Sequence, residues 1–154
     1  MAGRETPAPR AIRAAGVEHA VHEYAHDPAA DSYALEAASA LGLDPARVYK
    51  TLVVTLEEQL VVCIVPSGAT LDLRSLGKRA QLAPTDRAER VTGYVAGGIS
   101  PLGQRRALPT FLDDSALAHP TIFVSAGRRG LELELAPADL VALTRAQVRT
   151  LRRA

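Results

Sequence analysis

The sequence predicts a single-domain α+β fold, in which a mixed, mostly antiparallel sheet or partial barrel of about six to eight strands is flanked by four or five helices. A length of 154 residues suits one domain, expected to span residues 1–154. The composition, 47% hydrophobic and 23% charged, is typical of folded globular proteins. Helical and β-rich segments follow each other irregularly, which argues against a regular βαβ succession.

Capping residues mark the first two helices. A Thr-Pro pair opens the segment 7–15 and Gly16 follows it, so this segment is expected to be helical. Asp31 or Ser32 is expected to cap a second helix, which ends at Gly42.

β-rich runs predict the strands. Residues 48–56 and 60–65 are the most apolar and are separated by a short polar segment, so we expect a central, buried hairpin. The other expected strands are residues 19–24, 94–96, 108–112, 121–125 and 131–135, with a turn at residues 126–130 between the last two.

The second half of the chain also predicts helices and one unusual loop. Asp72 is expected to cap a basic helix. Residues 97–103 hold three glycines and a proline, so we expect a loop without regular structure. The expected helices cover residues 73–80, 86–91 and 137–143, and the basic tail from residue 145 has helical propensity.

Composition also restricts the class of protein. No apolar run approaches the ~20 residues of a membrane span, and the charged, proline-bearing N-terminus is unlike a signal peptide. The single Cys63 excludes an internal disulfide and a thiolate zinc site, and it suits a reducing compartment. We therefore expect a cytoplasmic protein without a membrane partner.

The charge is distributed unevenly. Residues 1–71 carry five basic and nine acidic side chains, whereas residues 72–154 carry thirteen and eight. The second half therefore suits an anionic partner such as nucleic acid, or it is a mixed solvated surface.

Only Lys50 and Lys78 are lysines among 18 basic residues. Either lysine could be one that arginine cannot replace, or one retained by chance.

Several familiar catalytic motifs are missing. The sequence contains no GxSxG, GxxxxGK[ST] or HExxH pattern. His19, His22 and His26 cluster in the sequence, but strand alternation separates the first two, so we expect no metal site. Cys63 lies within an apolar strand and is expected to be a small buried hydrophobe, not a nucleophile.

Four features remain as candidates for a site. Lys50 brings a charge to the start of an apolar strand, either facing a ligand or reaching water. The loop 97–103 either presents backbone N–H groups to an oxyanion or is a tight surface turn. Ser125 precedes a Gly-framed diarginine that suits phosphate or forms a plain hairpin turn. Glu132 and Glu134 alternate with leucines and are expected on the solvent face of their strand.

These segments together resemble the YbaK/EbsC family of free-standing aminoacyl-tRNA editing domains, which are related to the editing insertion of prolyl-tRNA synthetases. The resemblance covers nearly the whole chain, and its longest block is highly specific. It is carried by HEYAHDP at residues 22–28, VYKT at residues 48–51, TGYVAGGISPLGQ at residues 92–104 and IFVSAGRRGLEL at residues 122–133.

The resemblance also implies site residues. Lys50 would be the signature lysine, and backbone N–H groups around Gly97, Gly98 and Ile99 would polarise the substrate carbonyl. Glu132 stands where many members carry Asp. The residues expected to contact substrate are Tyr24, Thr51, Ser100, Ser125, Arg128, Arg129 and Glu132.

The branch resembled implies a deacylase for Cys-tRNA(Pro), and for Cys-tRNA(Cys) as well, in which the thiol of the substrate attacks its own ester. No cofactor or metal is then needed. The implied partners are the 3′ acceptor end of an aminoacylated tRNA and prolyl-tRNA synthetase. The alternatives are a deacylase for Ala, Ser or Thr on a tRNA that uses an activated water, and a non-catalytic tRNA-binding module.

Overall fold

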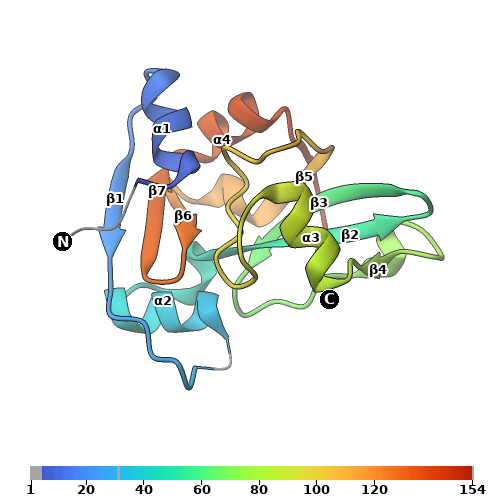
Figure 1. Ribbon diagram of the computed structural model, residues 1–154, viewed down its shortest axis with the longest axis horizontal. Helices are drawn as coiled ribbons and strands as arrows, with labels where there is room; N and C mark the ends of the chain where they lie inside the picture. Colours follow the sequence, from blue (N-terminus) through green and yellow to red (C-terminus); the bar gives the residue numbers. More distant parts are fainter. Residues whose placement is uncertain (1–4, 31, 154) are drawn as a thin grey trace.

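The computed structural model describes residues 5–30 and 32–153 and has the expected α+β organisation (Figure 1). Helices and strands alternate irregularly along the chain. In chain order they are α1 (Pro7–Ala14), β1 (Ala20–Glu23), α2 (Tyr33–Leu41), β2 (Tyr49–Leu56), β3 (Gln59–Pro66), β4 (Gln81–Leu82), α3 (Thr85–Thr92), β5 (Thr110–Asp113), β6 (Ile122–Arg128), β7 (Leu131–Leu135), α4 (Pro137–Thr144) and β8 (Gln147–Arg149), with 3-10 helices at Pro45–Arg47, Leu73–Ser75 and Asp114–Ala118.

The strands form two sheets and not a closed barrel. One sheet is antiparallel, in the order β1-β7-β6; the other is mixed, in the order β4-β2-β3-β5-β8, with β5 parallel to both of its neighbours. The expected hairpin is confirmed, because β2 and β3 pair antiparallel from Tyr49↔Pro66 to Leu56↔Gln59. Between the sheets, Val48 and Phe123 form an isolated parallel bridge.

The main core lies between the two sheets and is closed by α1 and α4. It contains fully buried side chains from every layer, among them Ile12 of α1, Ile64 of β3, Leu133 of β7 and Leu140 of α4. Burying one such side chain contributes about 1.5–3 kcal/mol. The central, buried position predicted for β3 is confirmed, because its residues are buried from Leu60 onward.

The caps expected for the first two helices are found in part. Ser32 caps α2, its hydroxyl accepting the Leu35 N–H at 3.3 Å, and Gly42 ends α2 with φ 68°. Asp31, the alternative cap, lies outside the described residues. Thr6 precedes α1, but its hydroxyl donates to the Ala126 carbonyl instead of capping the helix. This bond ties α1 to β6.

Two expected elements do not form. The helix predicted at residues 73–80 is only the 3-10 turn Leu73–Ser75, because Gly77 would weaken a longer helix while Leu73 and Leu76 pack on the large sheet. The strand predicted at residues 94–96 is also wrong. The Tyr94 N–H donates to the Thr92 hydroxyl and the Ala96 N–H to the Glu89 carboxylate, so side chains replace a strand partner.

The C-terminal tail is a strand and not a helix. Arg145 ends α4 in the left-handed conformation, with φ 57°. The chain then pairs with β5 as the parallel strand β8. Leu151, which follows, is completely buried against the outer face of the large sheet. Burial of this leucine and pairing with β5 outweigh the helical propensity of the tail.

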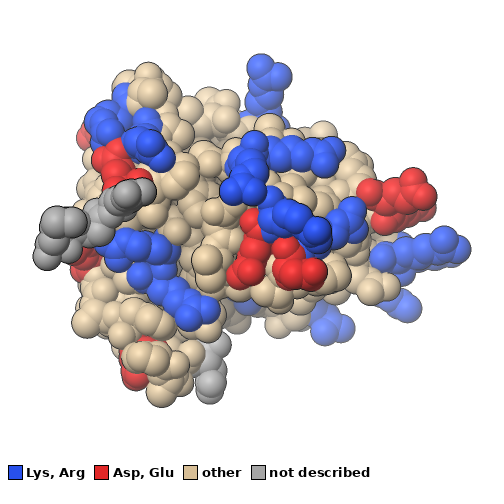
Figure 2. Space-filling view, viewed as in Figure 1, with Lys and Arg blue, Asp and Glu red and all other residues tan. Residues whose placement is uncertain are grey.

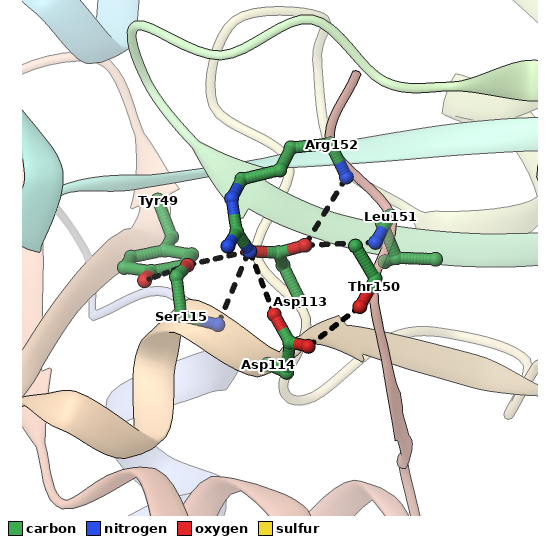
Figure 3. A network of polar contacts seen from close by, with 7 residues as sticks. All are labelled: Tyr49, Asp113, Asp114, Ser115, Thr150, Leu151 and Arg152. Carbon is green, nitrogen blue, oxygen red and sulfur yellow. Dashed lines mark hydrogen bonds and ion pairs between the residues drawn. The ribbon is translucent and has the colours of Figure 1, made fainter. Parts of the chain in front are cut away.

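A polar network fixes the tail to the rest of the fold (Figure 3). Asp113, completely buried, accepts the N–H groups of Leu151 and Arg152 and the Arg152 guanidinium. Burial raises the pKa of Asp113, but hydrogen bonds from Ser115, Leu151 and Arg152 outweigh it and leave the pKa below its ordinary value. The Tyr49 hydroxyl lies 2.7 Å from the Ser115 hydroxyl, so the network extends to β2.

None of the helices among residues 5–30 and 32–153 has the length and apolar character needed to cross a membrane.

Candidate functional site

A cavity of about 280 Å³ lies where the small sheet, the large sheet and α2 meet. It receives Lys50 from the start of β2, Ser125 from β6 and Glu132 from β7. The structure brings seven of the predicted site residues to this cavity, namely Tyr24, Lys50, Thr51, Gly97, Ile99, Ser125 and Glu132. Its other lining residues are Ser32, Tyr33, Ala34, Tyr49 and Leu52.

Lys50 supplies the cation of the cavity. It is half-buried and pairs with Val65 across the β2–β3 hairpin, so the strand register fixes its backbone. Burial lowers the pKa of Lys50 from its ordinary value, because the charged form is the one that loses hydration. An ammonium group in this position can donate to a substrate oxygen or phosphate.

Glu132 supplies a carboxyl group that the sequence pattern misplaced. Strand alternation predicted a solvent-facing side chain, but Glu132 is only 5% exposed. Its strand is the middle one of the small sheet, between His22 of β1 and Ser125 of β6, and the cavity lies over this position. Burial raises the pKa of Glu132 to about 8, so the carboxyl is mostly protonated at neutral pH and can donate a hydrogen bond.

Glu134, two residues further along the strand, is only partly buried. Its carboxylate accepts the Thr121 hydroxyl at 2.6 Å and lies 2.9 Å from His22 Nε2. The hydrogen bond from Thr121, together with His22, holds the pKa of Glu134 below its ordinary value. Both glutamates alternate with leucines along the strand, but one is buried and the other only partly buried. Sequence periodicity alone could not distinguish these two environments.

Thr51 brings an unsatisfied hydroxyl to the cavity. Its Oγ1 is buried and has no hydrogen-bond partner among the described residues. Buried hydroxyls are almost always paired with protein or ordered water. The Thr51 hydroxyl is therefore an unpaired polar group in the wall of this cavity.

The glycine loop, residues 97–103, approaches the cavity through close backbone contacts. Gly97 has φ 88°, and a Cβ there would lie 2.5 Å from the Tyr33 ring. A Cβ at Gly98 would lie 2.7 Å from the Arg128 backbone. Both glycines are therefore required for the loop to pack against α2 and the β6–β7 turn.

Ala96 fixes this loop from two sides. Its N–H donates to the Glu89 carboxylate at 2.7 Å, and its carbonyl accepts Arg129 Nη2 at 2.8 Å. Glu89 belongs to α3 and Arg129 to the β6–β7 turn. The segment leading to Gly97 is thus held between two elements far apart in sequence.

One expected backbone donor is already used. The Gly98 N–H donates to the Val95 carbonyl at 2.9 Å, and Gly98 does not line the cavity. In this conformation the Gly98 N–H is therefore not free to polarise a substrate carbonyl. Gly97 and Ile99 line the cavity, and neither of their N–H groups makes a hydrogen bond within residues 5–30 and 32–153.

Three other predicted contacts lie outside the cavity lining. Ser100 is completely buried, and its hydroxyl accepts the Leu102 N–H. Arg128 is exposed at the end of β6, where the strand continues beyond the predicted turn boundary. Arg129 stacks its guanidinium 4.0 Å from the centre of the Tyr33 ring and so supports a cavity wall.

Tyr33 and Tyr49 line the cavity but were not predicted from the sequence. Aromatic residues carry no sequence signal that separates a cavity wall from a core.

The three clustered histidines and Cys63 make their contacts within the protein and do not line the cavity. His22 contacts Glu134, His26 lies 2.8 Å from the Glu36 carboxylate, and His19 Nδ1 lies 2.8 Å from the Val17 carbonyl. The described part of the chain brings no three potential metal ligands together. Cys63 is completely buried in β3, as expected, and burial raises its pKa to about 12.

Comparison with known families identifies the family of this chain. The family model described as the aminoacyl-tRNA editing domain matches residues 27–143. The chain belongs to this family. The matched region contains most of the cavity lining, including Lys50, Gly97, Ser125 and Glu132, whereas Tyr24 precedes it.

Relatives of this editing domain are similar along most of their length. EbsC of Enterococcus faecalis, a proposed Cys-tRNA(Pro)/Cys-tRNA(Cys) deacylase, is 38% identical over 116 residues, which cover 71% of each protein. The crystal structure of a proposed trans-editing enzyme for prolyl tRNA synthetase has 30% identity and a TM-score of 0.83, covering 97% of this chain and 99% of that one. A chain from work on epitope grafting onto scaffold proteins has 27% identity and a TM-score of 0.84, covering 97% and 99%.

Proposed function

We propose that this editing domain is a trans-editing deacylase that hydrolyses Cys-tRNA(Pro), and Cys-tRNA(Cys) as well. The observation that carries the proposal is the cavity itself, which Lys50, Thr51 and Glu132 line together with Gly97 and Ile99 of the glycine loop. The name of EbsC supports the same substrate, and the name of the trans-editing enzyme supports an editing role linked to prolyl-tRNA synthetase.

The proposed chemistry uses the thiol of the substrate. The cysteinyl sulfur attacks the ester carbonyl carbon, the bond to the ribose oxygen breaks, and the thiol proton passes to that oxygen. The products are free tRNA and a cyclic thiolactone, which water opens to cysteine. Cys63 supplies no nucleophile to this scheme, because it is buried outside the cavity.

The residues of the chain then have to orient and polarise the substrate. Lys50 holds the ribose or phosphate of the terminal adenosine, and the Gly97 and Ile99 N–H groups stabilise the developing oxyanion. Orientation of the reacting groups contributes up to about 7–11 kcal/mol, and one donor to the oxyanion roughly 2.7–4 kcal/mol. These contributions are sufficient for catalysis without a protein nucleophile.

A panel of mischarged tRNAs tests the substrate. We expect the chain to deacylate tRNA(Pro) carrying cysteine much faster than tRNA carrying alanine, serine or threonine. Faster release of any of these three amino acids would assign the activity to another editing specificity. Binding of tRNA without release of any amino acid would support a non-catalytic module.

Prolyl-tRNA synthetase is the protein partner proposed for the cytoplasmic reaction. The support is the name of the similar trans-editing enzyme. Adding the synthetase to the deacylation assay is expected to lower the KM for Cys-tRNA(Pro). An unchanged KM would argue that the chain captures its tRNA alone.

A further inference from the structure

A group of arginines on α3 and the segment after it takes no part in the chemistry proposed above. Figure 2 shows basic side chains gathered over α3 and the segment after it, and a second basic group where β6 turns into β7. The first group, here named the α3 arginine face, consists of Arg87, Arg90, Arg105 and Arg106, all exposed.

Contacts hold these arginines close together. The Arg105 N–H donates to the Thr92 carbonyl at 2.8 Å, which fixes residue 105 against the C-terminal end of α3. The Arg105 guanidinium lies 3.5 Å from the Arg90 carbonyl. Arg87 and Arg106 line one surface hollow of about 430 Å³.

The acidic groups nearby leave Arg90 and Arg105 as the most available cations. Glu57 and Glu58 line the same hollow as Arg87 and Arg106 and partly balance their charge. The Glu89 carboxylate is used by the Ala96 N–H. Asp86 lies 3.8 Å from Arg90, but both side chains are highly exposed, so this ion pair is weak and can be replaced by a ligand.

A hydrogen bond connects α3, which carries part of the α3 arginine face, to the loop that lines the cavity. Glu89, the neighbour of Arg90, binds Ala96, and the next residue, Gly97, lines the cavity. Arg129 holds the other side of Ala96. The loop that borders the cavity is therefore held between α3, which carries Arg90, and the β6–β7 turn, which carries Arg129.

We propose that the α3 arginine face binds the phosphate backbone of the tRNA acceptor arm while the aminoacylated 3′ end occupies the cavity. This inference rests on the proposed function. A nucleic acid is the favoured occupant, because exposed guanidinium groups suit the regular phosphates of a duplex. The charge balance of the second half of the chain agrees with an anionic partner.

Binding of deacylated tRNA tests this face without requiring catalysis. We expect the double variant Arg90→Gln/Arg105→Gln to bind tRNA about tenfold more weakly and to reduce the slope of log Kd against log salt by about two, one for each lost phosphate contact. The control Arg74→Gln/Lys78→Gln removes the same charge from exposed positions outside this face. It is expected to change Kd less than twofold.

A variant that is expected to bind tRNA more tightly provides a test that misfolding cannot mimic. Asp86→Asn removes the acid beside Arg90 and is expected to tighten tRNA binding about twofold to threefold at low salt. Unchanged Kd and salt slope in the Arg90→Gln/Arg105→Gln protein would overturn the proposal. So would equal losses in the control, which would indicate net charge alone.

A small substrate separates this inference from the proposed function. The cysteinyl ester of adenosine has no acceptor arm, so its hydrolysis is expected to be the same in wild type and in Arg90→Gln/Arg105→Gln, while the KM for Cys-tRNA rises. Absence of hydrolysis of both substrates by wild type would refute the proposed function but leave the Kd result valid. Loss of synthetase binding with unchanged tRNA binding would assign the face to a protein partner and overturn the inference.

Discussion

The cation in the cavity is a lysine in a chain that otherwise uses arginine almost throughout. Lys50 is half-buried, and burial lowers its pKa because the charged form loses hydration. When protonated, its ammonium is compact and can donate in several directions. A guanidinium is larger, planar and fixed in its donor geometry. We therefore expect deacylation to depend on the shape of this cation as well as on its charge.

Lys50→Ala is expected to abolish measurable deacylation of Cys-tRNA(Pro), a loss of at least about a hundredfold, because a group that polarises or holds the substrate is removed. Lys50→Arg is expected not to restore activity. The assay is release of cysteine from the tRNA, with circular dichroism to establish folding. Lys78→Ala, at the other, exposed lysine, is the matched control; equal losses in both variants would contradict the assignment.

Cys63→Ser is expected to retain Cys-tRNA deacylation within about twofold, because the reacting thiol belongs to the substrate. The buried hydroxyl is expected to lower the free energy of unfolding by about 1–3 kcal/mol. Deacylation rate and urea unfolding are measured on the same preparation. An inactive but folded Cys63→Ser protein would mean that this cysteine takes part in the reaction.

Glu132 makes stability depend on pH. Its pKa is about 8 in the folded chain, against an ordinary 4.5. Between these values the folded state keeps a proton that the unfolded state has lost, so stability is full below the lower value and falls as the pH rises, by up to about 1.4 kcal/mol per pH unit. We expect Glu132→Gln to remove this fall, as measured by urea unfolding across that window.

Glu134→Gln is the matched control, with the opposite sign. The Thr121 hydrogen bond holds the pKa of Glu134 below its ordinary value, so this carboxylate contributes stability that is lost as the pH falls. A wild-type protein whose stability rises between pH 4.5 and about 8, with no difference in Glu132→Gln, would contradict the burial of Glu132.

Much of the cavity lining could be predicted residue by residue, but the burial of Glu132 could not. Lys50 and Gly97 stood out because a charge in an apolar strand and a run of glycines are unusual in any sequence. The burial of Glu132 had no such signal, because alternation shows which residues share a face and not what covers that face. The engagement of the Gly98 N–H with Val95 is likewise a property of the folded loop, with no signature in sequence.

At the scale of elements, the glycine loop depends on close backbone contact. Gly98→Ala is expected to lower the free energy of unfolding by about 1–3 kcal/mol and to reduce deacylation, because the new Cβ meets the Arg128 backbone at 2.7 Å. Gly68→Ala, where a Cβ meets nothing within 4 Å, is the control and is expected to be neutral. Urea unfolding and deacylation rates that are the same for both variants would contradict this packing.

The elements predicted correctly are those with strong local signals. The β2–β3 hairpin has two long apolar runs, and α2 has both a Ser32 cap and a terminal Gly42. The tail after Arg145 was misassigned because its pairing with β5 is a contact distant in sequence. Helical propensity is a weak local preference that such tertiary pairing overrides.

On the scale of the whole molecule, the cavity exists only where separate parts of the chain are assembled. Lys50 and Glu132 come from different sheets, joined at the Val48–Phe123 bridge. Tyr49, a wall of the cavity, is connected through Ser115 to the C-terminal network of Figure 3. The tail therefore supports the site even though it lies outside the matched residues 27–143.

The central claim is that the substrate provides its own nucleophile, and the decisive measurement compares tRNA(Pro) carrying cysteine with the same tRNA carrying serine while any thiolactone is trapped. Serine is nearly isosteric but has a much poorer nucleophile, so both substrates occupy the cavity and differ mainly in the attacking atom. We predict rapid release of cysteine through a trapped thiolactone and much slower release of serine. Equal rates for the two substrates, or a covalent adduct between cysteine and a side chain of the protein, would contradict the account.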